Sequence, residues 1–98
     1  MIVMFTARRL KPDAWEQFRR AFAEGTPPPG FQRGYHARNI RDEDDVISFG
    51  LFDMSIDDYR RWREDADAEE TRRVDAVSAF VENELVSGVY EVVEEMPG

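Results

Sequence analysis

Residues 2–7 constrain the fold most, because apolar side chains fill both alternating sets of positions in this short segment. Successive side chains of a β-strand point to opposite sides of the sheet. A strand that is apolar on both sides needs cover on both sides, so residues 2–7 predict a central strand. Residues 46–52 and 89–93 are also apolar on both sides and predict two more strands.

The segment after the first strand has the pattern of an amphipathic helix. Pro12 suits the first helical turn, and Gly25 suits the position that ends a helix. Between them, apolar residues recur at steps of three and four, as one face of a helix requires. These residues are Ala14, Trp15, Phe18, Ala21 and Phe22. Three prolines and a glycine at 27–30 then predict a short connection.

A β-hairpin follows this connection. Residues 31–41 predict a weaker strand, the acidic residues 42–45 a turn, and residues 46–52 a strong strand. Ser55, which has an acidic residue three positions later, predicts the start of a second helix.

The second helical region has an interrupted apolar stripe. The stripe begins with Ile56, Tyr59 and Trp62, fails over residues 64–70, and resumes with Val74, Val77, Phe80 and Val81. This pattern predicts two helical pieces joined at the acidic stretch, or one bent helix. Gly88 is expected to mark the exit into a fourth strand at residues 89–93.

The predicted order of elements is βαββαβ. It defines an α+β class of ferredoxin-like topology with a four-stranded antiparallel sheet. A length of 98 residues allows one hydrophobic core, so we expect a single domain over residues 1–98.

This topology leaves one side of the sheet uncovered. About 98% of strand-helix-strand crossovers are right-handed, which puts both helical regions on the same side. The other side is still apolar, with a bare face of roughly 600 Å² whose burial is worth roughly 15 kcal/mol. We therefore expect a homodimer through the sheet face, with a small apolar or aromatic ligand in the space between the two sheets.

Composition limits the classes of partner and cofactor. A net charge of −8 argues against nucleic acid or an anionic membrane as partner, since both need a basic surface. The absence of cysteine excludes disulfides, thiolate nucleophiles and Cys-ligated metals. The apolar start is too short for a signal peptide, and no apolar run approaches ~18 residues. We expect a cytoplasmic protein.

In this layout, the strand at residues 46–53 and the strand-to-helix passage at 52–55 resemble the dimeric α/β-barrel superfamily. The similarity is to small proteins of the antibiotic-biosynthesis-monooxygenase type and covers nearly the whole chain. The resemblance implies a dimer of ferredoxin-like subunits. It also implies an activity from a broad set: oxygenation of polycyclic quinols without a cofactor, haem cleavage, lactone isomerisation, or no known activity.

Two differences from these similar proteins limit the activities that we expect. Oxygenases and haem-degrading members often use an Asn on the first strand and a His on the second helical region. The first strand here has no Asn, and no His lies between Ser55 and Leu85. The haem-ligating residue has no counterpart, which argues against haem degradation. We predict no cofactor and no metal ligands, and one histidine alone cannot build a His-based metal site.

His36 is the first candidate for catalysis. It is the only histidine, and an imidazole has the only side-chain pKa that lies near neutrality without perturbation. Its neighbour Tyr35 is a candidate hydrogen-bond donor to a developing oxyanion. The candidate ligand-binding residues are Arg38, Asn39, Ser48, Phe52 and Trp62. The alternative for each is an ordinary structural or surface role.

The hairpin turn decides which candidates share a face. With a turn at 42–45, one side of the hairpin holds His36, Arg38, Ile40, Ile47, Phe49 and Leu51. The other side then holds Tyr35, Ala37, Asn39, Ser48, Gly50 and Phe52. The small residues of the second set leave room for a ligand, but one bulge would reverse the assignment, so both sets stay candidates.

Two functions are compatible with these residues. The first is a cofactor-independent monooxygenase, or a related catalyst, acting on a small aromatic or polyketide-like molecule between the sheets. The second is a non-catalytic dimeric protein that binds a small ligand or serves as a scaffold. A cavity of roughly 300 Å³ or more that contains Tyr35, His36 or Arg38 favours the enzyme.

Overall fold

The structure, a computed structural model, describes residues 1–65 and 74–98. Its sheet has the order β2-β3-β1-β4, and every adjacent pair of strands is antiparallel. Residues 74–78 are helical as well. The elements are β1 (Ile2–Leu10), α1 (Trp15–Ala23), β2 (Phe31–Asn39), β3 (Asp42–Phe52), α2 (Ile56–Asp65) and β4 (Val81–Glu91). The predicted α+β fold with a ferredoxin-like βαββαβ order is confirmed.

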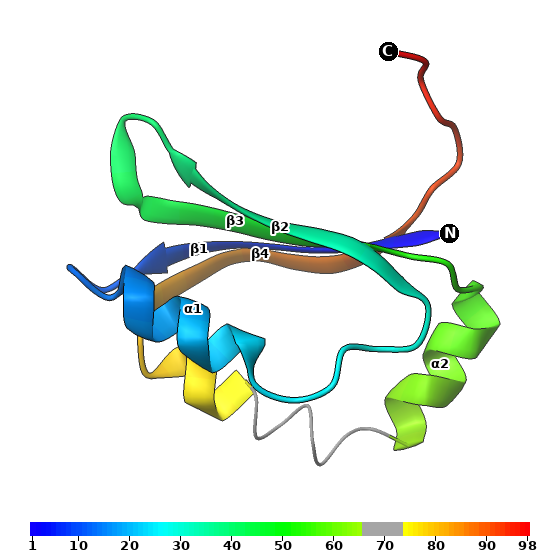
Figure 1. Ribbon diagram of the computed structural model, residues 1–98, viewed down its shortest axis with the longest axis horizontal. Helices are drawn as coiled ribbons and strands as arrows, with labels where there is room; N and C mark the ends of the chain where they lie inside the picture. The colour runs from blue at the N-terminus through cyan, green and yellow to red at the C-terminus, as the bar shows by residue number, and fades with distance from the viewer. Residues whose placement is uncertain (66–73) are drawn as a thin grey trace.

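The helices lie on one side of the sheet. Figure 1 shows α1 and α2 on the same side, beneath opposite ends of the strands, and no described helix on the other side. The predicted central position of β1 is confirmed, since it lies between β3 and β4. The crossover argument therefore correctly predicted a two-layer arrangement in the described part of the chain.

The core consists of two separate clusters on the helix side. One cluster, at the α1 end, contains Leu10, Phe18, Ala21, Val46 and Val77. The other contains Ile2, Phe52 and Met54, with Tyr59 and Trp62 of α2 packed against it. The middle of the sheet lies between the two clusters, which leaves space there.

Local signals explain both helices. The Ser55 hydroxyl accepts a hydrogen bond of 3.0 Å from the Asp58 N–H, so Ser55 caps α2 as predicted. Gly25 has a φ of 88°, a left-handed conformation that glycine adopts freely, just after the end of α1. Pro12 lies in the preceding turn, and α1 begins later than predicted, at Trp15.

The predicted turn of the hairpin was wrong. β3 begins at Asp42, and the connection is Ile40 and Arg41, with the Ile40 side chain fully exposed. The acidic residues are extended because partners hold them: Asp42 accepts a 2.6 Å hydrogen bond from Arg9, and Asp45 accepts one of 3.0 Å from Asn39. These cross-strand partners outweigh the turn propensity of an acidic run.

The register shift between Arg38 and Asn39, and not the moved turn, reverses the assignment of hairpin faces, as a single bulge was expected to do. Tyr35 pairs with Phe49, and His36 pairs with Ser48. Directly paired residues point to the same side, so the predicted side that joined His36 to Phe49 was wrong. His36, Arg38, Ser48, Gly50 and Phe52 share the helix side, and Tyr35, Ala37, Ile47, Phe49 and Leu51 share the open side. Three residues of β3 lie between the partners of Asn39 and Arg38, and this odd number is what exchanges the two sides.

The fourth strand is longer than predicted. β4 begins at Val81 and includes Gly88, so the expected helical role of Val81 and the exit at Gly88 were wrong. β1 extends to Leu10, which pairs with Val81, and β4 lengthens to cover it. The predicted joint at residues 64–70 falls mostly outside the described residues.

Candidate functional site

A cavity of about 760 Å³ lies on the helix side of the sheet. It borders all four strands, both helices and the loop after α1, which contributes Pro27 and Pro28. Its volume is within the usual range for small-molecule sites. The expected ligand space lay between two sheets, whereas this cavity lies within one chain, between its sheet and its helices.

Glycines form part of the cavity floor. Gly34 of β2 pairs with Gly50 of β3, and Met4 of β1 lies beside Gly50. The rings of Phe31 and Phe52 fold over these glycines: a Cβ on Gly50 would lie 2.9 Å from a Phe52 ring carbon. The two phenylalanine rings stand 5.3 Å apart. The two phenyl rings packed on the glycines therefore make this part of the floor apolar.

A row of polar residues crosses the sheet beside the glycines. In register order the row is His36 of β2, Ser48 of β3, Thr6 of β1 and Ser87 of β4. All four line the cavity. Nδ1 of His36 and Oγ of Ser48 are 2.6 Å apart, a short hydrogen bond. The row supplies the few placed polar groups that give a mostly apolar site its orientation.

Aromatic rings of α1 fix the orientation of His36. Its ring meets those of Phe22, Phe18 and Trp15 edge-on, with centroids 4.6, 5.5 and 5.9 Å away. If Nδ1 donates its proton to Ser48, Nε2 has the lone pair that a general base needs. The tautomer of His36 therefore decides which ring nitrogen can act as the base.

Arg8 brings a positive charge to the same side of β1. Its Nη1 donates a hydrogen bond to Oγ1 of Thr6, and its Nη2 is 3.8 Å from a carboxylate oxygen of Glu84. The guanidinium lies over the rings of Phe18 and Phe22, 5.7 Å from each centroid. Cations are attracted to aromatic faces at this distance.

Most of the predicted site residues border the cavity. Tyr35, His36, Ser48, Phe52 and Trp62 line it, and Arg38 and Asn39 do not. Arg38 lies over the Trp15 ring at 4.9 Å, and Asn39 binds Asp45 near the hairpin turn. Tyr35 borders the cavity while its ring stacks on Phe49 of the open side, 5.2 Å away.

Thr6 and Arg8 were missed as site residues. The first strand was predicted to end at residue 7, which left the orientation of Arg8 unconsidered. The alternation of side chains along the strand could have identified them, because Thr6 and Arg8 point to the same side of the sheet as Ile2 and Met4.

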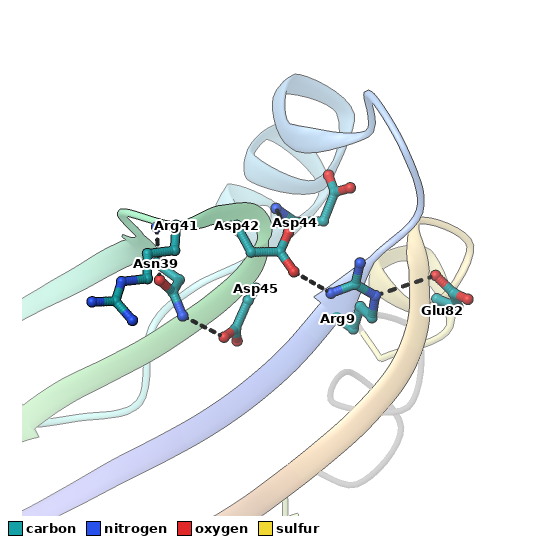
Figure 2. A network of polar contacts seen from close by, with 7 residues as sticks. All are labelled: Arg9, Asn39, Arg41, Asp42, Asp44, Asp45 and Glu82. Atoms are coloured by element: carbon teal, nitrogen blue, oxygen red, sulfur yellow. Dashed lines mark hydrogen bonds and ion pairs between the residues drawn. The ribbon is translucent and has the colours of Figure 1, made fainter.

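Ion pairs outside the cavity shift the pKa values of Arg9, Asp42 and Glu16. Figure 2 shows Arg9 between Asp42 and Glu82 near the hairpin end of the sheet. The Arg9 guanidinium, through its hydrogen bond and charge, lowers the pKa of the Asp42 carboxyl, and Asp42 raises the pKa of Arg9. On α1, Arg19 lowers the pKa of Glu16 in the same way. These ion pairs stabilise the fold and do not belong to the cavity.

Comparisons with known proteins show the fold class. No family model matches the sequence, and a search of curated proteins finds no match. Among solved structures, the chain has the ferredoxin-like fold of antibiotic biosynthesis monooxygenase-like proteins. The predicted resemblance is confirmed at the level of the fold.

Three of these structures illustrate the similarity. A Deinococcus radiodurans protein classed as an antibiotic biosynthesis monooxygenase has a TM-score of 0.74 at 14% identity, covering 99% of this chain and 97% of its own. A variant of SnoaB, a cofactor-independent oxygenase from Streptomyces nogalater, has 0.73 at 17%, with the same coverages. A variant of MhuD with two manganese protoporphyrin IX molecules per active site has 0.66 at 17%, covering all of both chains.

Within residues 1–65 and 74–98, no helix is long and apolar enough to cross a membrane.

Proposed function

We propose that this chain is a cofactor-independent monooxygenase, or a related catalyst, for a planar aromatic or polyketide-like molecule. The observation that carries the proposal is the His36–Ser48 pair on the wall of a 760 Å³ cavity with a glycine floor. The ligand would lie on the helix side of the sheet, because the cavity is there.

The proposed chemistry begins with a proton transfer. Nε2 of His36 takes a proton from an acidic C–H or O–H of the substrate, and Ser48 stabilises the imidazolium through Nδ1. The electron-rich substrate anion then reduces O₂ itself. For an anthrone-type substrate, the ring CH₂ becomes a carbonyl with one oxygen atom, and the other leaves as water with the two hydrogens. No external electron donor is needed.

Two of the similar structures support the choice of ligand class. SnoaB is named a cofactor-independent oxygenase, and MhuD binds planar porphyrins in its active site. Both have the same fold, so we transfer the ligand shape and the reaction type to this chain as part of the proposal. His36 is the only histidine and it lies on β2, so we retain our prediction that haem degradation is not the reaction.

Oxygen uptake with anthrone tests this function. Uptake by wild type should fall about 100-fold or more in His36→Ala, the usual size of a lost general base. Tyr35→Phe tests the second predicted catalytic residue. Because the Tyr35 ring stacks on Phe49 of the open side, we expect this variant to retain most of the activity.

Two results would contradict the proposed function. Equal rates in wild type and His36→Ala would remove His36 from the mechanism. No uptake by wild type with anthrone or with a polycyclic quinol would exclude the oxygenase.

A non-catalytic ligand-binding protein is the second candidate. It is favoured by β1, which has no Asn of the kind that the resemblance implies for oxygenases and presents Thr6 and Arg8 to the helix side. Saturable binding of anthrone without oxygen uptake would support this candidate. In either case we propose a cytoplasmic homodimer that pairs through the open side of its sheet.

A further inference from the structure

We propose that Arg8 forms an anion subsite in the cavity, and that Glu84 is an internal counterion which an acidic ligand displaces. The ligand class is a planar aromatic acid, with a carboxylate or an ionised hydroxyl at one edge. This inference rests on the proposed binding of an aromatic molecule in the cavity and adds the charge of that molecule.

Arg8 is a cation in mostly apolar surroundings. Its side chain is only 13% exposed, and its guanidinium lies over the rings of Phe18 and Phe22. A charge removed from water needs a partner of opposite sign to offset the lost hydration. Within the cavity, a ligand carboxylate can add strong, charge-assisted hydrogen bonds to Arg8.

Glu84 is a weak partner for this charge. Its carboxylate oxygen is 3.8 Å from Nη2 of Arg8, which is longer than a hydrogen bond. Its side chain is 51% exposed, so the carboxylate can turn into water at little cost. An entering oxyanion can therefore replace Glu84 beside Arg8 without leaving a buried charge unpaired.

The position of Arg8 relates this subsite to the proposed reaction. Arg8 and His36 both contact the rings of Phe18 and Phe22, and Thr6, which Arg8 binds, lies in the same row as His36. A ligand anchored at Arg8 by its acidic edge would have its ring beside His36. The subsite would thus orient the ligand as well as select it.

The chain contains a matched control on the opposite side of the sheet. Arg9 and Glu82 come from the same two strands and are also 3.8 Å apart, and Figure 2 shows that Arg9 also binds Asp42. Neither Arg9 nor Asp42 lines the cavity. Arg9→Gln changes the net charge as Arg8→Gln does, and Glu82→Gln matches Glu84→Gln. Any difference in ligand binding between the two variants of a matched pair is therefore due to the position of the residue and not to the change in net charge.

The experiment compares two probes with the same ring system, 2-naphthoate and the neutral 2-naphthalenemethanol, by equilibrium fluorescence titration. Wild type should bind the acid at least about tenfold more tightly, because a charge-assisted contact is worth that much. Arg8→Gln should reduce this preference to about twofold or less, and Arg8→Lys should retain part of it. Glu84→Gln should tighten binding of the acid several-fold and leave the alcohol unchanged. The two control variants should behave as wild type.

Several results would overturn the inference, and they differ from failure of the proposed function. If the alcohol binds and the acid has no advantage, the anion subsite is wrong while the aromatic cavity stands. If Arg8→Gln and Arg8→Lys weaken both probes equally, Arg8 acts through packing alone. Weaker binding of the acid by Glu84→Gln would contradict the counterion role. Binding of neither probe would refute both the subsite and the aromatic site on which it rests.

Discussion

Single side chains determine how this cavity is built. His36 was identified from the sequence because it is the only histidine, and that reasoning needed no structure. Its surroundings could not be predicted in the same way. They depend on one residue of register, which decides whether His36 points toward Phe22 and Ser48 or toward the open side.

Gly30 provides a prediction at the residue scale. It has a φ of 82°, and a Cβ at this position would collide with the carbonyl oxygen of Asp53, whose N–H bonds to the Gly30 carbonyl at 2.8 Å. Gly30→Ala should therefore destabilise the fold by roughly 1–3 kcal/mol, combining backbone strain with a forced displacement. Urea unfolding followed by circular dichroism measures this loss. Gly98→Ala, at a position with open space, is the control and should be neutral.

At the scale of elements, the strands and helices were largely predictable and their ends were not. The two-sided apolar segments predicted β1 and β3, and Ser55 predicted the start of α2. The ends of the elements were predicted wrongly where contacts with a strand distant in the sequence determine them. The acidic residues after Arg41 look like a turn in isolation, but Arg9 of β1 holds Asp42 in a strand. Composition alone does not contain that contact.

The Arg9–Asp42 pair predicts a pH dependence of stability. Because Arg9 lowers the pKa of Asp42 in the folded state, the pair stabilises the fold above the unfolded pKa of about 3.9 and loses this effect as the pH falls through the folded value. Asp42→Asn should lower Tm at pH 7 and converge with wild type toward pH 2. Thermal melts across this range test the trend. Glu43→Gln, a neighbouring charge change, should run parallel to wild type; a constant Asp42→Asn deficit at all pH values would argue against the pair.

At the scale of the whole molecule, the open side of the sheet is the feature on which the proposed homodimer depends. Phe5, Phe49 and Tyr35 form a ladder of rings across three strands, with centroids 6.4 and 5.2 Å apart. Figure 1 shows no described helix over this side. The gross gain from burying the face, roughly 15 kcal/mol, equals or exceeds the cost of association, about 4–15 kcal/mol. This balance favours the proposed homodimer.

Phe49→Glu tests the homodimer. A charge at the centre of the ring ladder cannot be buried without a partner, so we expect the variant to be a monomer at micromolar concentration in sedimentation analysis, while wild type is a dimer. Gln17→Glu, an equal charge change on exposed α1, should stay dimeric. A monomeric wild type under these conditions would refute pairing through this side.

The division of the core into two clusters has a consequence for how the cavity can evolve. Thr6 and Ser87 of the polar row belong to neither cluster, so their side chains contribute little to the packing that holds the helices on the sheet. Exchanges at these two positions can alter ligand selectivity at small thermodynamic cost. A fold arranged in this way can acquire new substrates by drift, because the residues that keep it folded and those that line its floor are different.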